Sequence, residues 1–121
     1  MNCWWAAEFV LTENRMESDW RKFRDLVPKL RERYLAERNA RIVAVLTDLK
    51  KNETERFWDA MEQMEKEARV LQGCLDGHSR SSMQMYILRM IGAGMLAEAD
   101  MEVFSEELRQ QVSFAFEGNR G

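Results

Sequence analysis

The segment that follows Asn52 constrains the fold more than any other part of the chain. Its apolar residues recur at spacings of 4, 3, 4, 3 and 4, and they are Phe57, Met61, Met64, Ala68, Leu71 and Leu75. Such spacing places all six on one stripe of an α-helix, the stripe that normally packs on a hydrophobic core. Asn52 with Glu55 resembles a capping box, and Gly77 ends the helix because glycine readily adopts a left-handed backbone. We therefore expect a helix over 53–76, with acidic residues on its opposite, solvated face.

A second long helix is expected just before it, over about 28–51. Its apolar seam is interrupted by Asn39 and consists of Leu35, Ile42, Leu46 and Leu49. A short polar turn separates the two segments, so together they predict a helical hairpin. Pro28 lacks a backbone N–H and disfavours helical geometry at the preceding residue. We therefore expect a short helix over 18–26, capped by Ser18 or Asp19, and a kink or break before the long helix.

Two shorter helices are expected over about 81–93 and 97–113. The first is apolar nearly all round, which is typical of a helix covered on several sides. The second carries one apolar stripe, formed by Met101, Phe104, Leu108 and Val112. The fold class predicted is all-α, an antiparallel bundle of four main helices. The long hairpin over 28–51 and 53–76 is expected to project beyond the two shorter helices.

The length of 121 residues indicates a single domain. Apolar residues make up 45% and charged residues 32%, a balance typical of a globular chain. We divide the chain into an N-terminal arm over 1–15, a helical core over 16–117 and a loose tail over 118–121. Trp4 and Trp5 in the arm are costly to leave in water, so we expect them to dock on the core or on a partner.

Groups that commonly carry catalysis are scarce. The chain has one histidine, His78, and two cysteines, Cys3 and Cys74, without a CxxC motif or a histidine pair that would indicate a zinc site. Cys74 and His78 are four residues apart, but the helix is expected to end between them, and a small core cysteine is the better interpretation. A carboxylate metal site would need Glu-x-x-His pairs on facing helices. We therefore expect that the protein is not an enzyme and that it binds no cofactor and no metal.

No segment is apolar over the length that a bilayer requires. The longest apolar-rich stretch, 3–11, spans nine residues and contains Glu8, about half of what a crossing helix needs. It lacks the basic start of a secretory signal, and two isolated cysteines are typical of reduced thiols. We expect a cytoplasmic protein that does not associate with membranes.

Charge is unevenly distributed along the chain. Residues 1–51 hold 11 basic and 8 acidic side chains, whereas residues 52–121 hold 7 basic and 13 acidic ones. The basic residues gather over 20–41, where the candidates for a partner or polyanion surface are Arg21, Arg24, Lys29, Arg31, Arg33, Arg38 and Arg41. Arginine forks suit phosphate groups, but helical pairs with nearby carboxylates are the more ordinary explanation. An isoelectric point near 5.3 also argues against a dedicated nucleic-acid binder.

A candidate anion site follows Gly77, at Ser79, Arg80 and Ser81. Helix N-termini present free N–H groups that hold anions. The alternative is that Ser79 or Ser81 caps the helix while Arg80 pairs with a carboxylate, and serine caps are far commoner than anion sites.

Aromatic and methionine-rich helical surfaces dominate what remains. Seven of the nine methionines fall between 61 and 101, and they indicate either core filling or a groove for a partner. The candidate apolar interface comprises Trp4, Trp5 and Phe116. We therefore expect a non-catalytic protein–protein interaction module, such as an adaptor, inhibitor or regulatory subunit. Its partner would be another protein or a second copy in a homodimer, and binding of nucleic acid through 20–41 is the alternative.

Overall fold

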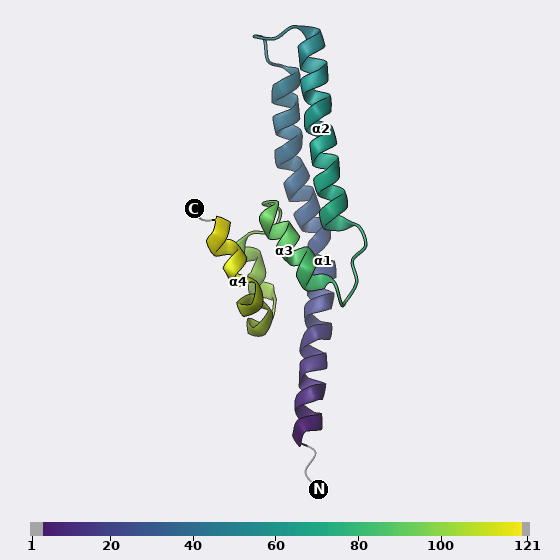
Figure 1. Ribbon diagram of the computed structural model, residues 1–121, viewed down its shortest axis with the longest axis vertical. Coiled ribbons are helices and arrows are strands. Elements are labelled where there is room, and N and C mark those ends of the chain that lie inside the picture. The colour runs from purple at the N-terminus through teal and green to yellow at the C-terminus, as the bar shows by residue number, and fades with distance from the viewer. Residues whose placement is uncertain (1–3, 120–121) are drawn as a thin grey trace.

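The computed structural model describes the backbone of residues 4–119 and the side chains of residues 15–118. Within this part of the chain every regular element is a helix (Figure 1), in the order α1 (Trp4–Leu46), α2 (Glu53–Leu75), α3 (Met83–Gly92), the short 3-10 helix η1 (Glu98–Val103) and α4 (Glu106–Asn119). The all-α class predicted from the sequence is confirmed.

The molecule is a long antiparallel hairpin with a small helical cluster at its side. Helices α1 and α2 run side by side, and α3, η1 and α4 gather beside the middle of α1 (Figure 1). The tip of the hairpin projects beyond the cluster in one direction, and the N-terminal part of α1 extends past it in the other. The predicted hairpin and its projection are therefore confirmed.

Helix α1 is continuous through Pro28, so the expected break between two helices is wrong. Proline removes one hydrogen bond, but Phe23 before it and Leu30 after it are both fully buried in the same core. Packing on both sides of Pro28 holds one helix axis, while the proline ring itself lies exposed. The expected caps are also wrong, because Ser18 and Asp19 lie inside α1.

The same helix includes most of the segment expected to be a separate arm. The backbone is helical from Trp4 onward and joins α1 without interruption. The side chains of Trp4 and Trp5 lie outside the described residues, so the expectation that they dock on a surface stays a prediction.

The predicted helix over 97–113 is two elements rather than one. The Asp100 carboxylate accepts a hydrogen bond from the Ala97 N–H at 2.7 Å, which tightens the first turn into η1. Phe104 then takes an extended backbone, and Ser105 restarts the helix because its hydroxyl accepts a hydrogen bond from the Leu108 N–H at 3.2 Å. Helix α4 consequently runs on to Asn119, beyond the predicted end.

The core lies where the middle of α1 meets the helical cluster. Its fully buried members include Phe23, Ile87, Met90 and Val112. Helix α3 contributes five buried residues, in accord with the central position expected from its apolar sequence. Gly77 has a φ of 83°, and a Cβ built there would lie 2.9 Å from the Tyr86 hydroxyl. The predicted glycine stop after α2 is confirmed, and no larger residue fits this turn without strain.

Candidate functional site

The contact between α1 and α2 is unusually polar. Tyr34 on α1 and Glu67 on α2 are both buried, and the tyrosine hydroxyl donates a hydrogen bond to the carboxylate. Gln63 donates a second hydrogen bond to Glu67 at 2.9 Å. Arg38 lies 3.7 Å from the same carboxylate, and its guanidinium sits 4.7 Å from the centre of the Tyr34 ring. A buried charge needs partners of this kind, so these residues specify how the two helices meet.

Burial and the neighbouring carboxylate change the titration of Tyr34. Desolvation is the main cause, followed by the hydrogen bond to Glu67, and together they raise the pKa of Tyr34 to about 12. The hydroxyl therefore remains a donor at neutral pH. Glu67 is one of the acidic residues expected on the solvated face of the helix, and for this residue the expectation is wrong because it is only 7% exposed.

The apolar residues near the tip of the hairpin lie on its outer surface. Among the described residues, eleven large hydrophobic side chains are exposed, and seven of them lie between residues 43 and 64. We define the apolar face as Leu46, Phe57, Met61 and Met64, with Val43 and Trp58 at its edges. Phe57 is 52% exposed and Met64 is 51% exposed. The expected inward stripe is therefore wrong for this half of α2, although Leu71 and Leu75 pack against the core.

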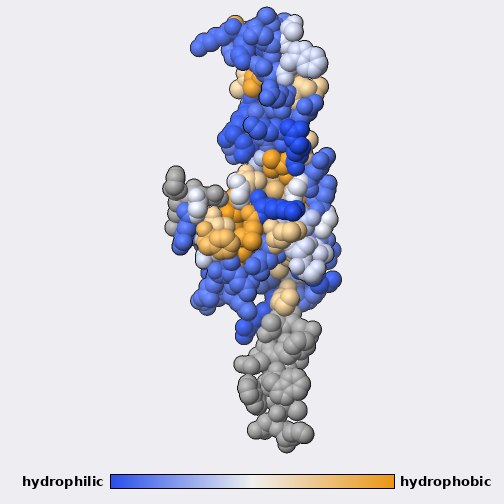
Figure 2. All heavy atoms as spheres, viewed as in Figure 1, coloured by the Kyte–Doolittle hydropathy of each residue, from blue (hydrophilic) through white to orange (hydrophobic). Residues whose placement is uncertain are grey.

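The seam expected on α1 divides in the same way. Ile42 is buried, whereas Leu46 is exposed and Leu49, in the turn, is 88% exposed. The buried Tyr34–Glu67 contact occupies the space between α1 and α2, so the outer apolar residues lie outside it. In Figure 2, hydrophobic side chains break the hydrophilic surface of the projecting end of the hairpin.

Helical geometry places the apolar residues of both helices on one side of the hairpin. With a rotation of about 100° per residue, the three α2 members of the apolar face lie roughly a quarter turn from Glu67. On α1, Arg38 faces Glu67. Leu46 lies roughly a quarter turn from Arg38, in the same sense along the chain. Because the helices are antiparallel, both turns lead to the same side. Leu30, which packs into the core, lies about a quarter turn from Arg38 in the opposite sense, so α1 turns a different side toward the core than the side that carries Leu46.

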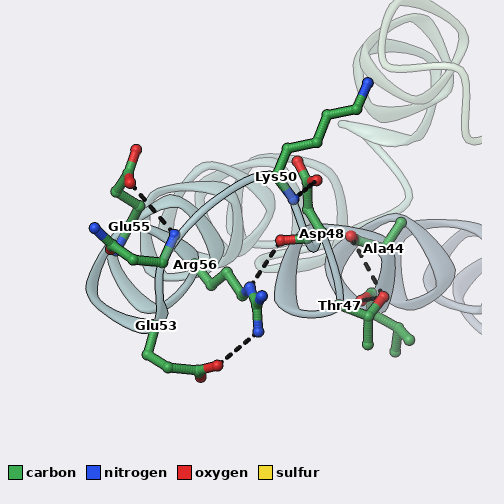
Figure 3. A network of polar contacts seen from close by, with 9 residues as sticks. Ala44, Thr47, Asp48, Lys50, Glu53, Glu55 and Arg56 are labelled. Carbon is green, nitrogen blue, oxygen red and sulfur yellow. Dashed lines mark hydrogen bonds and ion pairs between the residues drawn. The ribbon is translucent and has the colours of Figure 1, made fainter.

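The hairpin turn is held by its own polar network (Figure 3). The predicted capping box is present, because Asn52 accepts from the Glu55 N–H at 2.8 Å and Glu55 accepts from the Asn52 N–H at 3.3 Å. Arg56 reaches across the turn to the Asp48 carbonyl at 2.8 Å and pairs with Glu53 at 2.6 Å. These contacts tie the end of α1 to the start of α2, so the apolar face rests on a braced scaffold.

The candidate polyanion surface is divided by local pairing. Arg33 binds both carboxylate oxygens of Asp100, Arg38 pairs with Glu67, and Arg41 pairs with Glu37 at 2.5 Å. The hydrogen bond from Arg33 is the main reason that the pKa of Asp100 is lowered from its ordinary value. The other four candidates are exposed along α1, and they are Arg21, Arg24, Lys29 and Arg31.

The candidate anion site is internally satisfied. Arg80 forms a two-point contact with Glu17, at 2.8 and 3.0 Å, and this pairing lowers the pKa of Glu17. The Ser79 hydroxyl lies 2.7 Å from that of Ser82 and 3.3 Å from that of Ser81. The arginine therefore pairs with a carboxylate, as the alternative interpretation expected.

His78 and Cys74 occupy structural positions. The His78 ring lies between Phe23 and Tyr86, with centroid distances of 4.9 and 4.6 Å, and its Nε2 is 2.7 Å from the Cys74 carbonyl. The Cys74 thiol is buried, and desolvation raises its pKa. Over residues covered by the structure, no three His, Cys, Asp or Glu side chains gather as metal ligands would.

Phe116, the third candidate for the apolar interface, is half-buried. It packs against the core and lines a shallow cleft between η1 and α4 together with Met101 and Arg109. It lies in the helical cluster and does not adjoin the apolar face of the hairpin, while the side chains of the other two candidates, Trp4 and Trp5, lie outside the described residues. The members of the apolar face can be recognised as apolar from the sequence. Their exposure depends on how α1 and α2 are rotated about their own axes, which the sequence of one helix does not reveal.

None of the helices that the structure describes combines the length and hydropathy needed to cross a bilayer. Comparison with known protein families, with curated protein sequences and with solved structures finds no match to this chain.

Proposed function

We propose that this protein is a non-catalytic protein–protein interaction module, an adaptor, inhibitor or regulatory subunit, that binds through the apolar face of its hairpin. The observation that carries the proposal is the exposure of Leu46, Phe57 and Met64 on one side of a braced helical hairpin. Single exposed apolar residues are common on protein surfaces, but a contiguous set is typical of interaction sites.

The internal packing of the hairpin supports the same proposal. In a hairpin that is stable on its own, Phe57 and Met64 would normally lie in the contact between the two helices, and Glu67 would lie on the solvated surface. Here the carboxylate is inside and the apolar side chains are outside. Burial of a side chain such as Phe or Met contributes about 1.5–3 kcal/mol. That contribution is available to a partner that covers the face.

The few side chains that could carry catalysis already have structural contacts, which supports a role without catalysis. His78 and Cys74 are engaged in packing, and Arg80 is engaged by Glu17. The hairpin is therefore the part of the protein that binds, and these residues have structural roles.

Binding of a polyanion through 20–41 is the second candidate. It is supported by the exposed cations Arg21, Arg24, Lys29 and Arg31 on α1. It is weakened by the pairing of Arg33, Arg38 and Arg41 with carboxylates. Affinity for mixed-sequence DNA or RNA that falls steeply with salt would support it, and absence of binding at low salt would overturn it.

The test of the interaction proposal is affinity capture with a matched pair of variants. Tagged wild type should retain a chain, either a copy of itself or another protein, that Met64→Glu does not retain. Met85→Glu is the control, because Met85 is a comparably exposed methionine on α3. Equal retention of the same chains by all three proteins would contradict the proposal.

A further inference from the structure

The apolar face has the properties of a surface that pairs with a copy of itself. We propose that two copies of this chain associate face to face through their hairpins and form a four-helix bundle. The proposal rests on the proposed function and names the partner as a second copy. Each copy contributes the same set, Leu46, Phe57, Met61 and Met64, all of them exposed in the single chain. A twofold interface requires such self-complementarity.

The charges of the two hairpin limbs decide how the copies are oriented. Residues 28–46 of α1 hold five basic and two acidic side chains, whereas residues 53–75 of α2 hold three basic and six acidic ones. The first limb therefore carries a net charge of +3 and the second a net charge of −3. Placing α1 over α2 of the second copy joins opposite charges, whereas placing α1 over α1 joins like charges. The favoured arrangement has its twofold axis parallel to the hairpin, with both tips at the same end.

This axis also sets which residues meet. Within one chain, Asp48 lies at the same height along the hairpin axis as Arg56, and Tyr34 lies at the same height as Glu67, because these residues are in contact. Rotation about an axis parallel to the hairpin keeps each level unchanged. Leu46 of one copy therefore lies level with Phe57 of the second copy. The apolar face lies on the end of the hairpin that projects beyond the helical cluster (Figure 1), so the cluster does not obstruct the approach.

The size of the face predicts a reversible dimer. The uncovered part of α2, residues 53–68, is about 24 Å long at the usual helical rise, and two helices side by side are about 20 Å wide. The face therefore offers roughly 500 Å² per copy, or about 1,000 Å² in total, which is the lower limit for a specific interface. Dissociation in the micromolar range is the corresponding expectation, because small interfaces leave little free energy after the cost of association.

Sedimentation equilibrium of the purified 121-residue chain tests the association. Wild type should change from monomer to dimer as its concentration rises, and Met64→Glu should weaken the dimer at least tenfold. Met85→Glu should leave the dissociation constant unchanged, and circular dichroism should show equal helicity for all three. A wild type that stays monomeric at every concentration, or a dimer that Met64→Glu leaves intact, would overturn the proposal.

Cysteine cross-linking tests the orientation. In chains whose native Cys3 is replaced by serine, a mixture of Leu46→Cys and Phe57→Cys chains should form a linked dimer on mild oxidation, and Leu46→Cys alone should not. A link in Leu46→Cys alone, without one in the mixture, would contradict the pairing of α1 with α2 of the second copy. If the purified chain is monomeric while affinity capture still retains a different protein through Met64, the proposed function stands and the second copy is excluded as its partner.

Discussion

Asp19 on α1 accepts two hydrogen bonds from Ser105, one from the backbone N–H at 2.8 Å and one from the side-chain hydroxyl at 2.6 Å. The two residues are 86 positions apart, and the carboxylate is only 5% exposed. The Ser105 hydroxyl in turn accepts from the Leu108 N–H and caps α4. One side chain of the long helix therefore fixes where the last helix begins.

Replacement of Asp19 should consequently loosen the helical cluster. Asp19→Ala leaves the half-buried N–H and hydroxyl of Ser105 without their acceptor, and a lost hydrogen bond to a charged group costs about 1.5–3 kcal/mol. We expect that decrease in the free energy of unfolding measured with urea. Asp25→Ala, an exposed carboxylate on the same helix, is the control. A similar small loss in both variants would show that the Asp19–Ser105 contact adds no stability.

Ile87 should be a stability determinant of the core. It is fully buried in α3, so Ile87→Ala removes apolar contacts and leaves a cavity. A decrease of about 2–5 kcal/mol in the free energy of unfolding is expected. Met85→Ala, on the exposed side of the same helix, should change it by less than about 0.5 kcal/mol. Comparable effects of the two changes would contradict the assigned orientation of α3.

Pro28 should be a weak point of α1. It lies within the helix and is exposed, so Pro28→Ala restores a backbone hydrogen bond without removing buried contacts. Because proline costs up to about 3 kcal/mol in a helix interior, we expect a rise of roughly 1–3 kcal/mol in the free energy of unfolding. Lys29→Ala serves as the neighbouring control. A loss of stability in Pro28→Ala would indicate that the native helix needs the geometry that proline imposes.

Tyr34 should make the hairpin sensitive to alkali. Its pKa is raised in the folded chain from the ordinary 10.0 to about 12, so the neutral hydroxyl is favoured by folding. The stabilisation is complete below pH 10 and is lost as the pH rises toward 12. Ultraviolet absorbance should show a late ionisation step from Tyr34, and Tyr34→Phe should remove that step. Early ionisation of every tyrosine in the folded protein would contradict the buried Tyr34–Glu67 contact.

The sequence predicts best those features that depend on neighbours along the chain. The spacing after Asn52 and the capping box predicted α2 almost to the residue, with Leu75 as its last member. Gly77 was predictable for the same reason, since a left-handed turn requires a residue without a side chain. These features are decided within a few residues, and no distant contact opposes them.

Features decided by distant contacts were predicted poorly. Pro28 was expected to break α1, but burial of Phe23 and Leu30 on either side keeps the helix intact. Asp19 was expected to cap a helix, and it serves Ser105 on another element instead. The apolar stripe of α2 is recognisable from its spacing, yet the outward orientation of its first half goes with the buried Tyr34–Glu67 pair. No pattern within one helix reveals that pairing.

Oxidative footprinting of Met64 at different protein concentrations tests the central claim most directly. Met64 and Met85 are similarly exposed in the single chain, 51% and 44%, so peroxide should oxidise both at comparable rates in dilute protein. As concentration rises and the hairpins pair, Met64 should become protected while Met85 continues to react, as measured by mass spectrometry of peptides. Oxidation of Met64 that stays independent of concentration would show that a second copy does not cover the apolar face.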